Sequence, residues 1–369
     1  MSQLTYNPRK INEDDFPIAG SIADKLKFLL NYAVFAPFSH NAQPWRLEID
    51  NDAIELYADK TRALPVADPN YRELTISCGA ALFHLRIAIR HFGYGDIVEI
   101  FPEPNNPNLL ARIRLGSKRI PQLEENFIFR AILKRSTNRL TFEDNRLSQS
   151  LLSELRSACC SEQSGQQICT QQVSVDKRDA VVNLIAEGDR LQMADPLFRR
   201  ELAQWLHPAN NLNRDGIPGY ARGSNRRLDG LTPFISQAVR TLNLGKSQAA
   251  KDRKLAIQAP ALILISSESD RPRDWLATGE ALTHLLLRAR VEDVLASFFN
   301  QPIQVPQLRS RLQNLFPESG YPQILLRLGY AQEVEPTPRR SVDEVVSWGR
   351  FMKRPYRSLN KEKYQNELA

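Results

Sequence analysis

Apolar residues recur with helical spacing in two long segments of the chain, 76–92 and 275–295. Each segment is apolar on several sides, which predicts a helix buried deep in the fold. Both contain a similar pattern: GAALFHL at 79–85 and GEALTHL at 279–285 share Gly, Ala, Leu, His and Leu at identical offsets. Because glycine inside a helix is costly, the matching glycines predict that the two helices pack closely against each other. We interpret the repeat as an internal duplication.

Alternating patterns predict a mixture of strands and further helices, and therefore an α+β fold. The strands at 45–50 and 53–59 flank Asn51-Asp52, a hairpin signal. Further strands are expected at 97–101, 109–115, 171–175, 261–267 and 323–331, and helices at 21–34, 127–133, 147–159 and 177–192. The stretch 196–258 is less regular and rich in Gly, Arg and Asn. It is either a lid over an active site or a surface excursion.

Composition changes this picture little. The chain has 369 residues, 42% of them hydrophobic and 25% charged, which is ordinary for a soluble globular protein but long for one core. No apolar run is long enough for a membrane span, and residues 1–16 lack the apolar centre of a secretory signal. The four cysteines show no metal-ligand spacing, so we expect no metal and a cytoplasmic location. His84 and His284, at equivalent places in the repeat, are expected to be core residues rather than ligands.

The net charge of +7 comes from 49 basic and 42 acidic residues. A solvated surface explains this excess best, and the alternative is an anionic ligand, either nucleic acid or a phosphate-bearing cofactor. Nucleic acid is disfavoured because few aromatic residues accompany the basic stretches. The common phosphate-loop, dinucleotide, hydrolase and zinc-protease motifs are absent.

Three short segments carry candidate chemistry. The segment FAPFSHNAQPW (35–45) places small polar residues between two prolines. The segment KRSTNR (134–139) surrounds hydroxyl and amide groups with cations. The segment PTPRR (336–340) ends in two arginines. Arginine binds phosphate oxygens with two parallel hydrogen bonds, and hydroxyl groups add neutral donors. For the first segment, the alternative is a turn whose Ser and Asn merely cap backbone groups.

These residues resemble the nitroreductase family of flavin proteins. The family has an APSSxNxQPW loop, matched here by APFSHNAQPW with the following hairpin and DPNYRELTISCGAALFHL. The chain is similar to the Acg-like branch, in which two nitroreductase-like halves share one chain and mimic the family's homodimer. We expect halves at 1–120 and 121–355, a possible lid insert at 196–258 and a polar tail at 356–369. The first half has the loop and the second has the phosphate motif, which implies one composite FMN site per chain.

The resemblance also implies which residues would contact FMN. We expect the flavin and its ribityl chain to contact Pro37, Phe38, Ser39 and Asn41. We expect the phosphate to contact Lys134, Arg135, Ser136, Arg339 and Arg340. The pyrimidine edge of the ring would lie near Asn138 and Arg139. Gln43, Pro44 and Trp45 would fix the loop to the next strand. The family usually has a cation in place of Asn138, and a cation there stabilises reduced flavin, so the substitution bears on turnover more than on binding.

The first functional hypothesis is an FMN-dependent oxidoreductase that passes a hydride from NAD(P)H to an electron-poor acceptor such as a nitroaromatic or quinone. The flavin carries this chemistry, so no catalytic side chain is expected. The alternative is a protein that stores FMN under the lid, which the neutral Asn138 and the long insert favour. The expected partner is a small-molecule substrate, with neither nucleic acid nor a membrane. One chain would form a pseudo-dimer, present as a monomer or as a further homodimer.

Overall fold

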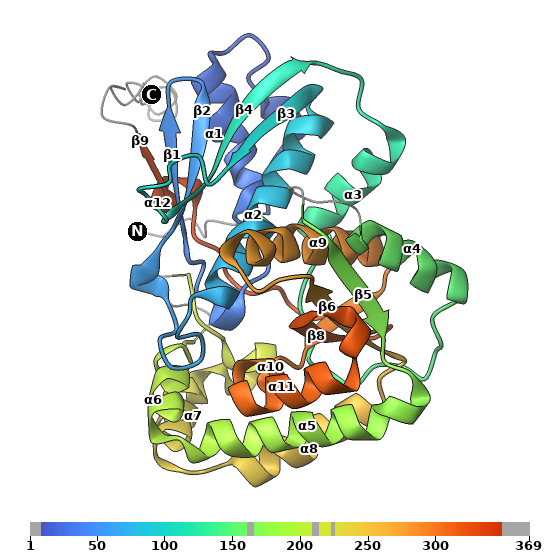
Figure 1. Cartoon of the computed structure of the whole chain (residues 1–369). Helices are drawn as coiled ribbons and strands as arrows, with labels where there is room; N and C mark the ends of the chain where they lie inside the picture. The colour runs from blue at the N-terminus through green and yellow to red at the C-terminus, as the bar shows by residue number, and fades with distance from the viewer. Residues whose placement is uncertain (1–8, 161–165, 209–213, 223–225, 349–369) are drawn as a thin grey trace.

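The computed structural model describes residues 9–160, 166–208, 214–222 and 226–348. The expected tail at 356–369 lies outside these residues, as do two short parts of the expected insert. The α+β prediction is confirmed: two sheets lie on either side of a central pair of helices (Figure 1). Within the described part of the chain, no helix is both long enough and apolar enough to cross a membrane.

The first sheet has the strand order β3-β4-β2-β1-β9. Its strands are β1 (Trp45–Asp50), β2 (Ala53–Ala58), β3 (Tyr94–Ile100), β4 (Leu109–Lys118) and β9 (Val346–Trp348). The hairpin predicted at Asn51-Asp52 is confirmed, because β1 and β2 pair in an antiparallel register with Asp50 opposite Ala53. β9 comes from the end of the described chain and pairs parallel with β1.

The second sheet repeats this arrangement with the order β7-β8-β6-β5. Its strands are β5 (Ile168–Gln172), β6 (Ala261–Ser267), β7 (Leu295–Phe298) and β8 (Tyr321–Gly329). In each sheet one long helix follows the second strand: α2 (Arg72–His91) follows β2, and α9 (Pro272–Val291) follows β6. The shared strand order and helix position support the internal duplication. The half boundaries themselves stay a prediction, and β9 joins the sheet of the other half.

The prediction that the two glycine-containing helices pack together is confirmed. α2 and α9 cross so closely that a Cβ atom on Gly79 would lie 2.0 Å from the carbonyl oxygen of Leu276. In the same way, a Cβ atom on Gly279 would lie 1.9 Å from the carbonyl oxygen of Ile76. The two contacts are reciprocal, as contacts across a two-fold axis are. Only glycine therefore permits this crossing.

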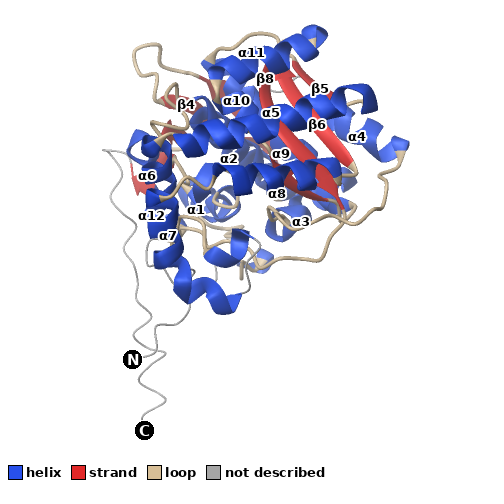
Figure 2. Ribbon diagram, turned by 90° about the horizontal axis from the view of Figure 1, so that it is seen from below, coloured by secondary structure: helices blue, strands red, loops and turns tan. Residues whose placement is uncertain are grey.

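β6 is buried on both faces, as its unbroken apolar sequence predicts. Ile263 and Ile265 pack in the cluster that includes α9 and α4 (Gln149–Cys160). Leu262 and Leu264 point the other way, into a cluster with α5 (Val175–Ala194), α8 (Gly245–Ile257) and α11 (Pro306–Leu315). Figure 2 shows α5 and α8 on this side of the second sheet. Outside 196–258, the other α-helices of the described chain are α1 (Ile22–Ala33), α3 (Leu123–Lys134), α10 (Gln301–Gln304) and α12 (Val342–Val345).

The prediction of an irregular stretch at 196–258 is wrong. The residues described there form three α-helices, α6 (Pro196–Gln204), α7 (Thr232–Thr241) and α8, and two short 3-10 helices. Proline stands in the first turn of α6 and α7, where its missing N–H costs nothing, so it starts these helices rather than breaking them. Together with α5 they fill the connection between β5 and β6, where the first half has only the Asn51-Asp52 turn.

Candidate cofactor site

The 35–45 segment has an unusual backbone. His40, Asn41 and Gln43 have φ angles of 56°, 59° and 53°, in the left-handed region that residues with side chains seldom adopt. Such a conformation persists only where surrounding contacts hold it, and it is common at ligand-binding sites. The polar side chains of the segment provide these contacts.

Gln43 holds the segment to two distant parts of the chain. Its side chain is fully buried, donates from Nε2 to the carbonyl oxygen of Arg214 (2.9 Å) and accepts at Oε1 from the backbone N–H of Arg340 (2.8 Å). We expected Gln43 to fix the loop to the following strand, and these bonds reach elsewhere. Trp45 begins that strand, and its ring packs edge-on against Phe38 with 5.0 Å between centroids.

Asn41 and Arg339 join the loop to the PTPRR segment. Arg339 Nη1 donates to Asn41 Oδ1 at 2.8 Å, and Asn41 Nδ2 donates to the carbonyl oxygen of Pro338 at 3.3 Å. The guanidinium of Arg339 also lies over the ring of Phe38, with its Cζ 4.8 Å from the centroid. Two of the three candidate segments are therefore in direct contact.

The KRSTNR segment completes the site. A cavity of about 40 Å³ lies where all three segments meet, lined among others by Asn41, Arg135, Ser136 and Arg339, with Arg9 from near the N-terminus. Cations and neutral donors thus form most of the polar lining of a small space, together with one carboxylate, Glu335.

The electrostatics of this small cavity favour an anion. Arg135 is buried and has no ion-pair partner among the described residues. Burial, and then the charge of Arg9, lower the pKa of Arg135 to about 9. Ser136 Oγ is buried and has no hydrogen-bond partner within the described chain. A phosphate group would supply both the missing charge and the missing acceptor, so these residues fit the phosphate of FMN.

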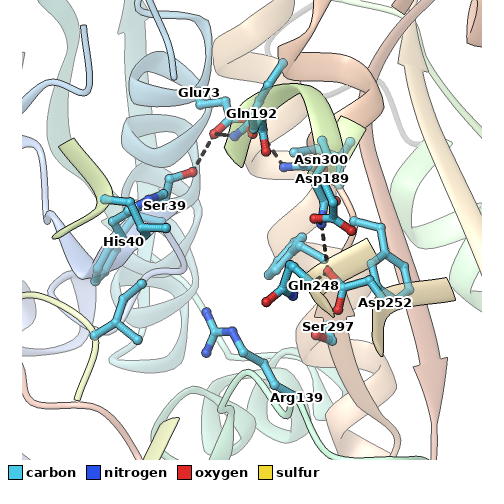
Figure 3. A pocket seen from close by; sticks show the side chains of 18 of the residues that line it. Ser39, His40, Glu73, Arg139, Asp189, Gln192, Gln248, Asp252, Ser297 and Asn300 are labelled. Carbon is cyan, nitrogen blue, oxygen red and sulfur yellow. Dashed lines mark hydrogen bonds between the residues drawn. The ribbon is translucent and has the colours of Figure 1, made fainter. Parts of the chain in front are cut away.

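A larger cavity, of about 270 Å³, adjoins the small one. Pro37, Phe38 and Ser39, for which flavin contact stays a prediction, line one side of it, and residues of the second half line the other. Ser39 Oγ donates to Glu73 Oε2 at 2.6 Å, and Gln304 Nε2 donates to the same carboxylate at 2.9 and 3.0 Å. Glu73 therefore connects the loop to the second half across the cavity (Figure 3).

Arg139 is the charged residue among those that line both cavities. It lines both of them, and Figure 3 shows its side chain extending into the larger one. Asn138, which we expected near the pyrimidine edge, lines neither. It is fully buried, donates from Nδ2 to the carbonyl oxygen of Gln332 (2.7 Å) and accepts at Oδ1 from the N–H of Leu140 (2.9 Å). Its amide is therefore engaged with the backbone, and the neighbouring Arg139 is a cation that lines the cavity.

Two of the expected phosphate contacts stand apart from the small cavity. Lys134 is exposed at the end of α3, and the side chain of Arg340 donates from Nη2 to the carbonyl oxygen of Glu344 at 2.6 Å. Neither residue lines the cavity. The role of Arg340 visible in the structure is its backbone bond to Gln43.

The far wall of the larger cavity contains residues that the sequence did not suggest. Asp189 on α5 and Asp252 on α8 both line it, and both are buried. One signal was available: Gly188 lies inside a helix, where a Cβ atom would come 2.7 Å from the side chain of Gln301. A glycine within a helix indicates that another segment packs closely against the helix backbone. Here the segment around Gln301 packs against Gly188, next to Asp189.

Comparison with known proteins supports the resemblance. The uncharacterised protein Rv3127 of Mycobacterium tuberculosis is 29% identical over 329 residues, which cover 87% of this chain and 92% of that one. From the same organism, Acg, named as a candidate NAD(P)H nitroreductase, is 28% identical over 334 residues, 87% of this chain and 95% of that one. Both proteins match this chain over most of its length, with identities just below 30%. The sequence-based recognition is therefore confirmed.

Solved structures with partial similarity were also found. The FMN- and NADPH-dependent nitroreductase NfnB of Sphigopyxis sp. strain HMH is 18% identical, with a TM-score of 0.40, over 60% of this chain and 98% of that chain. NfnB of Mycobacterium smegmatis, solved with NADPH, is 14% identical with a TM-score of 0.40, over 61% of this chain and 99% of that one. No family model matches the sequence.

Proposed function

We propose that this chain binds FMN in the composite site and reduces an electron-poor acceptor, such as a nitroaromatic or a quinone, with NAD(P)H as the electron donor. The observation that carries the proposal is the small cavity, where Arg135 lacks an ion-pair partner and Ser136 Oγ lacks a hydrogen-bond partner among the described residues. The Acg homologue is named for the same activity, which supports this reading.

Each segment of the site has a distinct task in this proposal. Arg135, Ser136 and Arg339 hold the phosphate, while Phe38 and Ser39 line the space for the ring system. Bound FMN supplies hydride transfer, which protein side chains cannot perform. The surrounding walls limit access of water to the ring and orient the acceptor.

Arg139 takes the role that the family pattern gives to the position of Asn138. A cation beside the ring stabilises the negative charge that reduction adds, and Arg139 lines both cavities with its side chain in the larger one. Its Nη1 donates to the carbonyl oxygen of Ala221 at 3.1 Å, a bond that positions the side chain and leaves its charge in place. The neutral Asn138 is thus compatible with turnover.

Storage of FMN is a second candidate, which one observation favours. Phe198, Ile217 and Leu255, all from the connection between β5 and β6, line the larger cavity and cover part of it. A ligand enclosed in this way exchanges slowly with solvent. Storage predicts a bound flavin that dithionite reduces and NADPH does not.

A visible spectrum of the purified protein, saturated with FMN, tests both candidates. Under anaerobic conditions, rapid bleaching by NADPH or NADH supports the oxidoreductase. A stable yellow complex that only dithionite bleaches supports storage. Absence of FMN binding in equilibrium dialysis would refute both.

A double variant tests the phosphate assignment. Arg135→Ala with Arg339→Ala removes two cations from the small cavity and should lower FMN affinity by at least about 100-fold, because charge-assisted hydrogen bonds contribute roughly 1.5–3 kcal/mol each. The control is Arg130→Ala, which removes an exposed cation from α3. Unchanged affinity in the double variant, with the circular dichroism of the wild type, would contradict the assignment.

A further inference from the structure

Two acidic side chains are held together on the cavity wall that faces the 35–45 segment. Asp189 on α5 is 3% exposed and Asp252 on α8 is 8% exposed. A single amide bridges them, because Gln301 Nε2 donates to Asp189 Oδ1 at 3.0 Å and to Asp252 Oδ2 at 2.9 Å. Gln248 Nε2 donates to the same oxygen of Asp252 at 2.9 Å. Figure 3 shows the pair across the cavity from Ser39 and His40.

The pair retains a proton near neutral pH. Burial, and then the negative charge of Asp252, raise the pKa of Asp189 to about 8. Two carboxyl groups in such proximity titrate as a unit and share one proton. The charged groups that face the pair are Arg190 on α5, Lys251 on α8, Arg327 on β8, Arg139 after α3, and Glu73 on α2. Of these, Arg190 lowers the pKa of Asp189, an effect smaller than that of burial and Asp252.

An independent feature of the same cavity indicates a ligand with an oxygen atom. Arg327 lines the cavity, is 1% exposed, and donates from Nη2 to the carbonyl oxygen of Leu140 at 2.7 Å. Its Nε and Nη1 atoms have no hydrogen-bond partner among the described residues. Burial lowers the pKa of Arg327 to about 10, which leaves the group charged at neutral pH. A buried cation with two unused donors needs an acceptor, and the cavity is where a substrate could provide one.

We propose that Asp189, paired with Asp252, is the proton donor to the oxygen of the acceptor, and that Arg327 donates a hydrogen bond to that oxygen. The inference rests on the proposed function and extends it to a catalytic residue. A quinone becomes a hydroquinone by gaining a hydride, from reduced flavin, and one proton. The proton forms a new O–H bond as the O–H bond of the Asp189 carboxyl breaks. Asp189 is left as a carboxylate and takes a proton from water before the next cycle.

A purely structural role is the competing explanation. The Gln301 bridge joins α5, α8 and α10. If the pair had only this role, its loss would lower stability and would not selectively slow the reaction with acceptors that need a proton. The two explanations therefore differ in how a variant responds to acceptors that do and do not need a proton.

The test compares two oxidants of the FMN-loaded enzyme after photoreduction, which makes it independent of NAD(P)H. 1,4-Benzoquinone needs a proton when it is reduced, and ferricyanide takes electrons alone. In stopped-flow experiments at pH 7, Asp189→Asn should reoxidise about 100-fold more slowly with benzoquinone, the lower end of the usual contribution of a general acid. Its rate with ferricyanide should match the wild type. The control is Asp179→Asn, an exposed carboxylate on the same helix, which should be unchanged with both oxidants.

A benzoquinone rate within threefold of the wild type in Asp189→Asn would overturn the proposal. Equal slowing with both oxidants would also overturn it, because it would indicate a structural disturbance. Asp252→Asn provides a second variant: it removes the charge that holds the proton on Asp189, so the pH at which the benzoquinone rate declines should move to lower values.

A measurement on the apoprotein separates failure of this inference from failure of the proposed function. Carbon-13 NMR of labelled aspartate carboxyl groups should show one group that titrates near pH 8 and disappears in Asp189→Asn. If FMN fails to bind, the proposed function fails while this titration remains measurable. If every aspartate titrates below pH 6, the proton donor is excluded even in a working flavoenzyme.

Discussion

Gly79→Ala places one methyl group in the contact between α2 and α9. The new Cβ would lie 2.0 Å from the carbonyl oxygen of Leu276, whereas ordinary contact begins at 3.4 Å, so the helices must separate by about 1.4 Å (3.4 − 2.0). The obstructing atom belongs to a helix backbone and cannot rotate away. Overpacking of this kind typically costs about 1–3 kcal/mol, and a clash with backbone falls at the upper end. Alanine has a higher helix propensity than glycine by about 1 kcal/mol, so the net loss in the free energy of unfolding is about 2 kcal/mol.

Urea unfolding, followed by circular dichroism, measures this loss as a lower midpoint with an unchanged slope. Gly230→Ala is the control, because a Cβ atom there meets nothing within 4 Å. Gly279→Ala should cost a similar amount, since the contact is reciprocal. The two losses should be less than additive in the double variant, because helices already separated leave room for the second methyl. A Gly79→Ala protein as stable as the wild type would refute the reasoning.

Two other predictions concern pH and the phosphate site. Burial lowers the pKa of His84 to about 3, so only the unfolded chain takes up this proton between pH 6.5 and 3, and stability is lost as the pH falls through that window. In His84→Asn the slope of unfolding free energy against pH should become shallower by at most about 1.4 kcal/mol per unit, and equal slopes would contradict this. Arg339→Lys keeps the charge but loses the fork that reaches Asn41, so FMN affinity in a fluorescence titration should fall roughly tenfold. If Arg339→Lys bound FMN as tightly as the wild type, the positive charge alone would be sufficient for phosphate binding, and the prediction would be wrong.

Local pattern was enough to predict the repeated core. The glycines at 79 and 279 indicated the helix crossing, and the alternating and unbroken apolar runs located β1, β2 and β6. His84 is buried and contacts the carbonyl oxygen of Tyr32 through Nδ1 at 3.2 Å, so the expectation of a core histidine is confirmed. These strands, the helix crossing and the buried histidine all depend on burial, and the spacing of apolar residues along the sequence predicts burial directly.

Other features depend on long-range contacts that the local pattern does not record. β7 has only four residues and directly follows α9, so its sequence reads as a continuation of the helix. α8 is largely polar, and its amphipathic character is weak because Asp252 faces a cavity rather than solvent. Asp189 and Asp252 are 63 residues apart (252 − 189), and each alone resembles a surface carboxylate. Only the packing of α5 against α8 brings them together.

The site closes through bonds between residues nearly 300 positions apart, with Asn41 and Arg339 separated by 298. At a synthesis rate of roughly 5–20 residues per second, the ribosome needs roughly 15–60 s to pass from one residue to the other. During that interval Asn41 lacks Arg339, and Gln43 lacks the backbone N–H of Arg340, so two of the bonds that hold the 35–45 segment cannot form. The proposed FMN site is therefore complete only after this interval. The helix crossing at Gly79 and Gly279 needs α9, which ends at Val291, 48 residues before Arg339 (339 − 291), so it can form before the site closes.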